Sequence, residues 1–361
     1  MATATYSKTK ALQLEKMTRE ILSELPQIVS EFILALRDST QPLTRYGYVR
    51  DIRTFLKYLQ RENVSFAGKD LISFTAKDFE KLTAKDLNLY LDYLTLYFND
   101  DDNMITNDEL GKMRKFYSLR SFYKWMFRQQ YVKSDVTALV ITPKRHEKPI
   151  IRLDLEETEK MLNEAQSGEK LSAKQKVYHE LTSLRDTAIV TLLLGTGIRV
   201  SECVGLNVTD INLENNSFLI TRKGGNQTIL YFPDEVANAL KAYMEQRKEI
   251  TPIPGHEEAL FLSLQKRRIT ERSIENLVKK YAAIAAPLKN KISPHKLRST
   301  FGTNLYNETG DIYLVADVLG HSDINTTRRH YAAINENRRK YAATKVVLHE
   351  NSENDSQDSD K

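Results

Sequence analysis

A short stretch rich in charge and proline divides this sequence into two parts with different patterns. Residues 142–152 (TPKRHEKPIIR) hold two prolines, four lysines or arginines and one histidine, with little apolar periodicity. Proline fixes its own φ and disfavours helix in the residue before it, so the stretch is typical of a linker. A chain of 361 residues is long enough for two domains. We therefore predict two domains, joined by a linker whose charge would let it cross phosphates.

Before the linker, the sequence has the period of helices that are buried on one side. Apolar residues recur at intervals of three and four from about residue 21 to residue 140, which predicts an all-α domain. One helix has an apolar stripe from Tyr48 to Leu59. A second, over residues 108–130, has a stripe that runs from Leu119 to Phe127. Both carry lysines and arginines off the stripe, so each has a basic outer face.

These basic faces are candidates for contact with DNA phosphates. The last thirteen residues hold five acidic side chains and one basic one, so the rest of the chain carries +9 against +5 for the whole. A basic body suits a polyanionic partner. For either helix alone, the alternative is a solvated charged face. The basic residues that we expect to contact DNA, in the two helices and the linker, are Arg45, Arg50, Arg53, Lys57, Lys112, Lys115, Arg120, Lys124, Lys144 and Arg145.

After the linker, helical and strand-like patterns alternate. A strongly apolar stretch over residues 186–194 predicts a helix that stops at a Gly-Thr-Gly sequence, and residues 198–206 predict a short helix. Three short strands with Asn/Gly turns follow, over residues 211–213, 217–222 and 228–232. From Pro233 onward the pattern is helical again. This half is therefore predicted to be mainly α with a small β-sheet.

Composition excludes several classes of protein. The single cysteine, Cys203, excludes an internal disulfide, and no Cys/His cluster marks a structural metal site. The N-terminus lacks the apolar core of a leader, and no stretch approaches the roughly 18 apolar residues needed to cross a bilayer. These features predict a soluble protein of the reducing cytoplasm with no membrane partner. Residues 349–361 are polar and acidic, so we expect a disordered tail.

A histidine and an arginine share one face of a helix late in the sequence. Ser293-Pro294 predicts the start of this helix and Gly310 its end, so His295 and Arg298 lie three residues apart on one side. Arg298 falls at the edge of the apolar stripe, and we expect its guanidinium to be half buried. A buried charge needs a partner, which is either an anionic ligand or a carboxylate in a structural salt bridge.

Two further positions follow in the chain. Residues 312–319 predict a helix stopped by Gly320, with His321 just past its end, and the next helix carries Tyr331. Taken singly, Gly320-His321 is an ordinary helix stop and Tyr331 an ordinary amphipathic tyrosine. Their joint order with the residues before them is what carries information.

That order resembles the catalytic signature of the tyrosine recombinase, or phage-integrase-like, family. The residues that carry the resemblance are Arg199, Lys223, His295-x-x-Arg298, Gly320-His321 and Tyr331, in the stretches GTGIRVSECVGL, TRKGGNQT, SPHKLRSTFGTNLY and VLGHSDINTTRRHY. The resemblance extends over residues 24–348. The segments LTAKDLNLYLDYL and ITPKRHEKP look most like the Xer group, especially XerS-type recombinases, which act without a second recombinase. One departure is Ser299, where the family often has a histidine.

Elementary chemistry explains why these residue types suit strand transfer. Charge builds on the non-bridging oxygens of a phosphodiester as a nucleophile adds, and Arg199 and Arg298 supply planar, permanently charged forks for those oxygens. His321 would donate a hydrogen bond to a phosphate oxygen. Glu202, about one helical turn after Arg199, would orient a neighbouring cationic or imidazole group.

The remaining roles follow from the resemblance. Tyr331 would be the nucleophile and His295 the acceptor of its proton, because a phenol with a pKa near about 10 is a poor nucleophile unaided. Lys223, on a Gly-Gly hairpin, would protonate the leaving 5′ oxygen, although a simple turn residue is the alternative. No carboxylate pair at ligand spacing and no GxxxxGK[ST] motif is present. We therefore expect no metal, no ATP and no other cofactor.

The resemblance implies an N-terminal all-α, SAM-like core-binding domain and a mixed α/β catalytic domain that form a C-shaped clamp on DNA. The expected divisions are an extension (1–23), the core-binding domain (24–141), the linker (142–152), the catalytic domain (153–348) and an acidic tail (349–361). The implied partners are duplex DNA with an inverted-repeat core site, a homotetramer on two such sites and, as a further candidate, a DNA translocase.

The function that the resemblance favours is resolution of chromosome dimers at a dif-like site, through a 3′-phosphotyrosine and a Holliday junction. An integrase or excisionase of a small mobile element is the alternative. A type IB topoisomerase shares the chemistry as a monomer. A DNA-binding protein with a dead site is disfavoured by the complete cluster.

Overall fold

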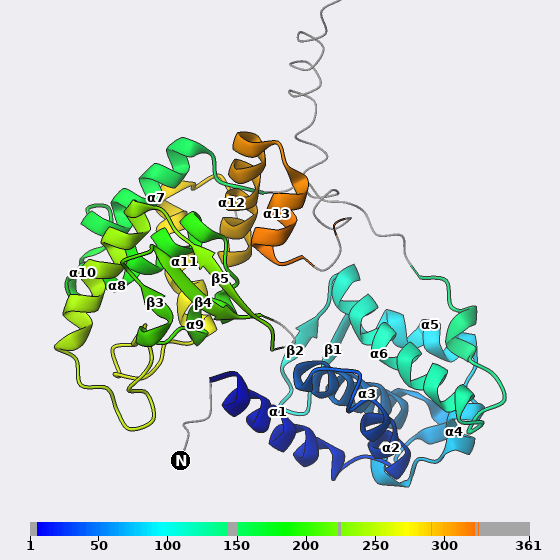
Figure 1. The fold of residues 1–361 in the computed structure, drawn as a ribbon. Helices are drawn as coiled ribbons and strands as arrows, with labels where there is room; N and C mark the ends of the chain where they lie inside the picture. The colour runs from blue at the N-terminus through cyan, green and yellow to red at the C-terminus, as the bar shows by residue number, and fades with distance from the viewer. Residues whose placement is uncertain (1–5, 143–150, 223–224, 290, 322–323, 325–361) are drawn as a thin grey trace, which may run out of the picture. The chain divides into compact units, whose positions relative to one another are not determined.

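The computed structural model describes residues 6–142, 151–222, 225–289, 291–321 and 324. The chain divides into two units, residues 1–147 and 148–361, and each is described by itself (Figure 1). Lys144 and Arg145 of the linker lie outside the described residues. Within the described ranges, no helix is both long enough and apolar enough to cross a membrane.

The first unit is a set of helices whose apolar faces meet in one core. The helices are α1 (Tyr6–Leu22), α2 (Gln27–Ala35), α3 (Pro42–Glu62), α4 (Ala76–Glu80), α5 (Ala84–Tyr93) and α6 (Glu109–Arg128), with 3-10 turns η1 (Val64–Phe66), η2 (Leu71–Ser73) and η3 (Val136–Leu139). Phe32 lies against Phe122 with ring centroids 5.2 Å apart, and Phe55 meets Tyr90 edge-on at 4.8 Å. Aromatic contacts between α2 and α6 and between α3 and α5 therefore hold the helices together.

The apolar stripes predicted for α3 and α6 are largely confirmed, with one error. Ile52, Phe55 and Phe122 are fully buried. Phe127, which was predicted to be buried, is 48% exposed. At 100° per residue it falls about 90° from the centre of the α6 stripe, so its side chain points along the surface and not into the core.

A short antiparallel hairpin interrupts the helices of this unit, which the prediction of a purely helical domain missed. β1 (Leu96–Phe98) pairs with β2 (Met104–Thr106), with Phe98 opposite Met104. Strands of three residues carry too little alternation to be recognised in a sequence. The turn between them is acidic, and its Asp100 pairs with Lys57 and Arg61 of α3.

The second unit combines helices with a small sheet, as predicted. Its helices are α7 (Leu155–Ser167), α8 (Ala173–Thr196), α9 (Val200–Gly205), α10 (Asp234–Lys248), α11 (Glu271–Ala285), α12 (Pro294–Thr309) and α13 (Ile312–Leu319), with a 3-10 turn η4 (Val208–Asp210). The strands β3 (Ile211–Asn212), β4 (Ser217–Thr221) and β5 (Gln227–Tyr231) form an antiparallel sheet in the order β3-β4-β5. Each strand end lies within one residue of its predicted place.

Two predicted boundaries in this unit are wrong. Helix α8 begins well before residue 186, at a capping box formed by Ser172 and Gln175, a signal that the serine and glutamine at that spacing carry in the sequence. The helical pattern expected after Pro233 is broken between α10 and α11. There the sequence TPIPG prevents a helix, and the chain instead forms isolated bridges, one of them between Leu262 and Arg268.

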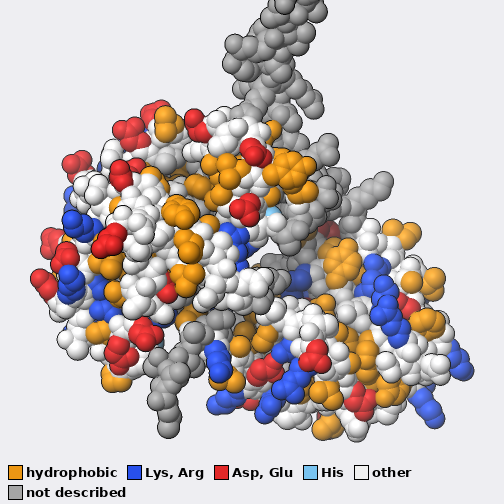
Figure 2. All heavy atoms as spheres, viewed as in Figure 1, with side chains coloured by type: hydrophobic (Ala, Val, Ile, Leu, Met, Phe, Trp, Pro, Cys, Tyr) orange, Lys and Arg blue, Asp and Glu red, His pale blue; other side chains and the backbone are white. Residues whose placement is uncertain are grey.

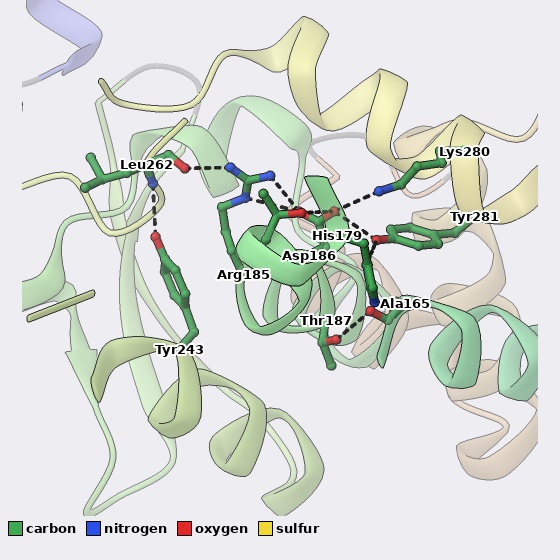
Figure 3. A network of polar contacts seen from close by, with 10 residues as sticks. Ala165, His179, Arg185, Asp186, Thr187, Tyr243, Leu262, Lys280 and Tyr281 are labelled. Carbon is green, nitrogen blue, oxygen red and sulfur yellow. Dashed lines mark hydrogen bonds and ion pairs between the residues drawn. The ribbon is translucent and has the colours of Figure 1, made fainter. Parts of the chain in front are cut away.

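A network of polar contacts centred on Asp186 ties α8 to α11 (Figure 3). The Asp186 carboxylate, 1% exposed, pairs with Arg185 at 2.7 Å and Lys280 at 3.0 Å and accepts a hydrogen bond from Tyr281 Oη at 2.9 Å. Tyr281 also meets His179 Nδ1 at 3.1 Å. Because removing one partner of a buried pair leaves an uncompensated charge, this network fixes the two helices in one register.

Helices α12 and α13 pack side by side (Figure 1), through Val315 and Leu319 against Phe301 and its neighbours. Both approach the end of α8 at Gly197, which has φ +62°. A Cβ at Gly197 would lie 2.9 Å from Cγ of Phe301 and 3.1 Å from Leu319. Only glycine fits this place, both for its backbone angles and for the lack of space.

Candidate active site

Three arginines from different elements bind the C-terminal end of α13. Arg222 donates from Nη1 to the carbonyl of Asp317 at 3.1 Å and from Nη2 to that of Val318 at 2.9 Å. Arg298 donates to the carbonyl of Leu319, and Arg199 donates to that of Gly320 at 3.0 Å. The last carbonyls of a helix lack the N–H donors of a further turn and carry its partial negative charge, so they attract cations. One helix end therefore gathers three permanent positive charges, which we call the arginine cluster (Arg199, Arg222 and Arg298).

Arg199 is placed by the start of α9, where it occupies the N-cap position. The Glu202 carboxylate accepts the Arg199 main-chain N–H at 2.8 Å and pairs with its Nη1 at 2.7 Å. The Arg199 side chain is 34% exposed while that of Glu202 is 6% exposed. A guanidinium has five N–H donors. The contacts of Nη1 with Glu202 and of Nη2 with Gly320 leave the other donors of this partly exposed side chain for further partners. The cation that Glu202 orients is thus Arg199 itself.

Arg298 lies deeper than the half-buried place predicted for it, at 6% exposed. Its Nη1 donates to the carbonyl of Gly197 at 2.6 Å and its Nη2 to that of Leu319. The partners of this buried charge in the described residues are thus main-chain oxygens. The partners predicted from the sequence were an anionic ligand or a carboxylate. These contacts also link the ends of α8, α12 and α13 at a single side chain.

The two histidines occupy different positions around this cluster. His321 directly follows Gly320, and its main-chain N–H donates to Ala316 at 2.9 Å, which closes the helix end. His295 lies one turn before Arg298 on α12 and is exposed. Ser299, the departure from the family pattern, donates its hydroxyl to the His295 carbonyl at 3.1 Å, so it is accommodated within the helix.

Lys223 and Tyr331 lie outside the described residues. The structure therefore brings together Arg199, Glu202, Arg298 and His321, and it adds Arg222 to them. Arg222 is not among the site residues predicted from the sequence. Its only signal in the sequence was its position before Lys223 at the end of a strand.

The structure offers no candidate metal centre in the described part of the chain. Among those residues, no three His, Cys, Asp or Glu side chains lie close enough together to hold a metal ion.

The predicted DNA-facing side chains of the first unit fall into two groups, of which the first points inward. Arg45 is 5% exposed and binds Glu15 and the carbonyls of Arg37 and Thr40. The prediction that Arg45 lies on the outer basic face is therefore wrong. Its side chain joins α3 to α1 and to the loop between α2 and α3. Arg120 is half buried and donates to the carbonyl of Thr137 at 3.0 Å.

The second group lies at the surface, where Lys and Arg side chains are mixed with acidic and apolar ones (Figure 2). Arg53 and Lys57 are paired with Glu24 and Asp100, and Lys112 is paired with Glu109. Exposed ion pairs are weak and are screened by salt, so phosphates can replace these acids. Arg50 and Lys124 are exposed. Lys115 is half buried, and desolvation lowers the pKa of its ammonium.

Comparison with known proteins supports one assignment. The model of the phage integrase family matches residues 151–338, just over half of the chain. The tyrosine recombinase XerC of Caldanaerobacter subterraneus subsp. tengcongensis is 30% identical over 335 residues, which cover 90% of this chain and 87% of that protein. This chain belongs to the phage integrase family. It is a site-specific tyrosine recombinase of the Xer group.

Solved structures agree at the level of the fold. The chain resembles the XerH site-specific recombinase bound to difH substrate, with a TM-score of 0.59 and 20% identity, over 94% of this chain and 96% of that one. It also resembles the Tn1549 transposon integrase in complex with circular intermediate DNA, with a TM-score of 0.62 and 20% identity, over 88% of this chain and 98% of that one.

Proposed function

We propose that this chain binds a duplex core site with inverted repeats, cuts each strand with Tyr331 and rejoins it to a partner strand. The observation that carries the proposal is the gathering of Arg199, Arg298 and His321 at the end of α13. These residues come from separate elements of the second unit and meet at one helix end. Such a group of fixed donors, two of them permanently positive, suits a phosphodiester, on which negative charge increases in the transition state.

In the proposed reaction, the Tyr331 oxygen attacks phosphorus as His295 accepts the phenolic proton. The bond to the 5′ oxygen breaks, and Lys223 supplies the proton that this oxygen needs. Arg199, Arg298 and His321 hold the non-bridging oxygens. The 3′-phosphotyrosine conserves the phosphodiester bond energy, so religation to a partner strand through a Holliday junction requires neither a metal nor ATP. Arg199 and Arg298 meet main-chain carbonyls here, so we propose that DNA redirects part of each fork toward the phosphate.

The proposal includes the arrangement implied by the family resemblance. A core-binding domain (24–141) and a catalytic domain (153–348), joined by the linker (142–152), would close around DNA as a C-shaped clamp. The extension (1–23) precedes the first domain in the chain and the acidic tail (349–361) follows the second. Four copies would act on two DNA sites in the cytoplasm, and a DNA translocase would control them. The exposed Arg50 and Lys124 and the weakly paired Arg53, Lys57 and Lys112 would bind phosphates.

The nucleophile is tested with a nicked duplex that traps the covalent adduct. The duplex would carry a short inverted repeat found by its protection by the protein, sought beside the gene and at the replication terminus. We expect Tyr331→Phe to bind this duplex with unchanged affinity and to form no adduct on a denaturing gel. Tyr313→Phe is the matched control, because Tyr313 is exposed on α13 and should form adduct at the normal rate. A normal adduct yield from Tyr331→Phe would refute the assignment.

Chromosome dimer resolution is tested separately from the chemistry. We expect deletion of the gene to cause filamentous cells with unsegregated chromosomes, and a chromosomal copy of Tyr331→Phe to fail to restore division. Integration of an excised DNA circle, with normal segregation in the deletion strain, would favour the mobile-element role over the dif-like site.

A further inference from the structure

Arg222 links the turn that contains Lys223 to the end of α13. On one side, its main chain closes the turn: the Arg222 N–H donates to Asn226 at 2.8 Å, and the Arg222 carbonyl accepts from Gly225 at 3.1 Å. On the other side, its guanidinium holds the carbonyls of Asp317 and Val318. Lys223 is the next residue in the chain. The base of its turn is therefore attached, through one side chain, to the helix that leads to His321.

The place of Arg222 is closely fitted. A Cβ on Gly320 would lie 2.5 Å from Cζ of Arg222 and closer still to Nη1, so the guanidinium lies directly against the Gly320 backbone. Arg222 Nε is buried without a hydrogen-bond partner among the described residues. Burial lowers the pKa of its guanidinium, and neighbouring Arg199 lowers it further, opposed by Glu202. Keeping a charge in this position is costly, which argues against a surface arginine that lies there by chance.

Arg222 differs from the other two arginines of the cluster in what it joins. Arg199 divides its terminal nitrogens between Glu202 and Gly320. Both terminal nitrogens of Arg222 instead bind neighbouring carbonyls of α13, and its Nε is buried. It is thus suited to hold the base of its own turn against this helix.

We propose that Arg222 is a positioning residue for strand cleavage, which anchors the base of the Lys223 turn to the end of α13 and so restricts the positions open to the general acid. The inference rests on the proposed function, in which Lys223 protonates the leaving 5′ oxygen. A hairpin turn with no such anchor would sample many positions. Because proton transfer needs donor and acceptor within hydrogen-bond reach, a mobile acid would protonate the leaving oxygen less often.

The test compares two substrates in full-length protein. One is the nicked duplex described above, and the other is the same duplex with sulfur in place of the bridging 5′ oxygen at the cleavage site. A thiolate leaves without a proton far more readily than an alkoxide, because a thiol has a pKa near about 8.5. Loss of the general acid should therefore slow cleavage of the oxygen substrate only. Single-turnover cleavage rates and dissociation constants are measured for wild type, Arg222→Met, Arg222→Lys and Lys223→Ala. Arg272→Met is the control for loss of a positive charge, because Arg272 is exposed on α11.

General acids contribute about 10² to 10⁴ in rate, and a displaced acid should lose part of this. We expect Arg222→Met to cleave the oxygen substrate about 10- to 100-fold more slowly, to bind it with a dissociation constant like that of wild type, and to cleave the sulfur substrate like wild type. Lys223→Ala should show the same pattern with a larger loss. Arg272→Met should match wild type on both substrates. Arg222→Lys, which keeps a donor, should fall between wild type and Arg222→Met, and it serves as the test variant if Arg222→Met does not fold.

Two results would overturn the inference while leaving the proposed function intact. One is a normal rate for the Arg222 variants on the oxygen substrate, while Lys223→Ala is slow and is restored by sulfur. The other is an equal loss on both substrates, which would mean that Arg222 acts through the phosphate-binding groups or the general fold. By contrast, normal cleavage of the oxygen substrate by Lys223→Ala would refute the acid role in the proposed function, and the inference with it.

Discussion

Replacing Gly320 with alanine tests the geometry of the arginine cluster. Gly320 has φ +61°, a conformation that costs an alanine roughly 1 to 2 kcal/mol. The added Cβ would also occupy the place of the Arg222 guanidinium, which must move and lose its hydrogen bonds to Asp317 and Val318. Two bonds at about 1 kcal/mol each bring the expected loss of stability to about 3 to 4 kcal/mol. In urea this loss corresponds to a shift in midpoint of roughly 1 to 2 M.

The sequence offers a separate probe for each unit. The single tryptophan, Trp125, lies on α6 of the first unit, and the single cysteine, Cys203, lies fully buried on α9 of the second. Tryptophan fluorescence and pulsed thiol labelling along a urea series therefore report the two units independently. We expect Gly320→Ala to lower the labelling midpoint and to leave the fluorescence midpoint unchanged.

Two variants separate the strain of the backbone from the displacement of the arginine. Gly255 has φ +87° and nothing within 4 Å of an added Cβ, so Gly255→Ala should cost only the roughly 1 to 2 kcal/mol of strain. With Arg222→Met already in place, Gly320→Ala should likewise cost only its strain, so the two changes should couple by about 2 kcal/mol. If Gly320→Ala costs no more than Gly255→Ala, or if the coupling is zero, Arg222 does not lie against Gly320 in solution.

Four further outcomes are expected. Arg298→Lys should slow adduct formation by about 10² to 10³ because lysine cannot replace a planar fork, and near-normal cleavage would leave Arg298 with a structural role only. Cleavage in excess EDTA should proceed at an undiminished rate, and loss of activity that Mg²⁺ restores would contradict the proposed chemistry. Asp51→Ala should lower the stability of the first unit by about 1 to 3 kcal/mol, since buried Asp51 accepts a hydrogen bond from the buried Ser118 hydroxyl and binds Arg114, which stays solvated. A shift in the fluorescence midpoint alone is the expected result. Burial raises the pKa of the Cys203 thiol, so native protein should resist thiol reagents at pH 8 to 9. The free energy of unfolding should also fall as the pH rises above the unfolded thiol pKa of about 8.5, because only the unfolded state then loses the proton. Rapid labelling of native protein would exclude this burial.

Local signals in the sequence were sufficient wherever a helix or strand depends on its own residues. Gly310 and Gly320 end α12 and α13 as predicted, because only a residue that tolerates positive φ closes those helices. The start of α8 had a comparable signal, the capping box of Ser172 and Gln175. Apolar periodicity alone does not detect it. The prolines between α10 and α11 were equally visible and were given too little weight.

Other errors came from partners that are distant in the sequence. Arg45 was assigned to the basic surface from its place on a helical wheel, yet Glu15 and the carbonyl of Thr40 draw it into the core. The wheel gives the direction of a side chain on its own helix but contains no information on which other segment covers that face.

For the site, the sequence by itself determined the order and types of the reactive residues, and with them the family and the chemistry. Only the tertiary structure decided that Arg199, Arg222 and Arg298 meet at one helix end, and that Arg222 belongs with them. The physical reason is that the carbonyls at the end of α13 come together only once that helix has formed, and they attract cations from wherever the fold brings them. A motif records which side chains are present, but the acceptors that hold them are main-chain atoms, which have no letter in a sequence.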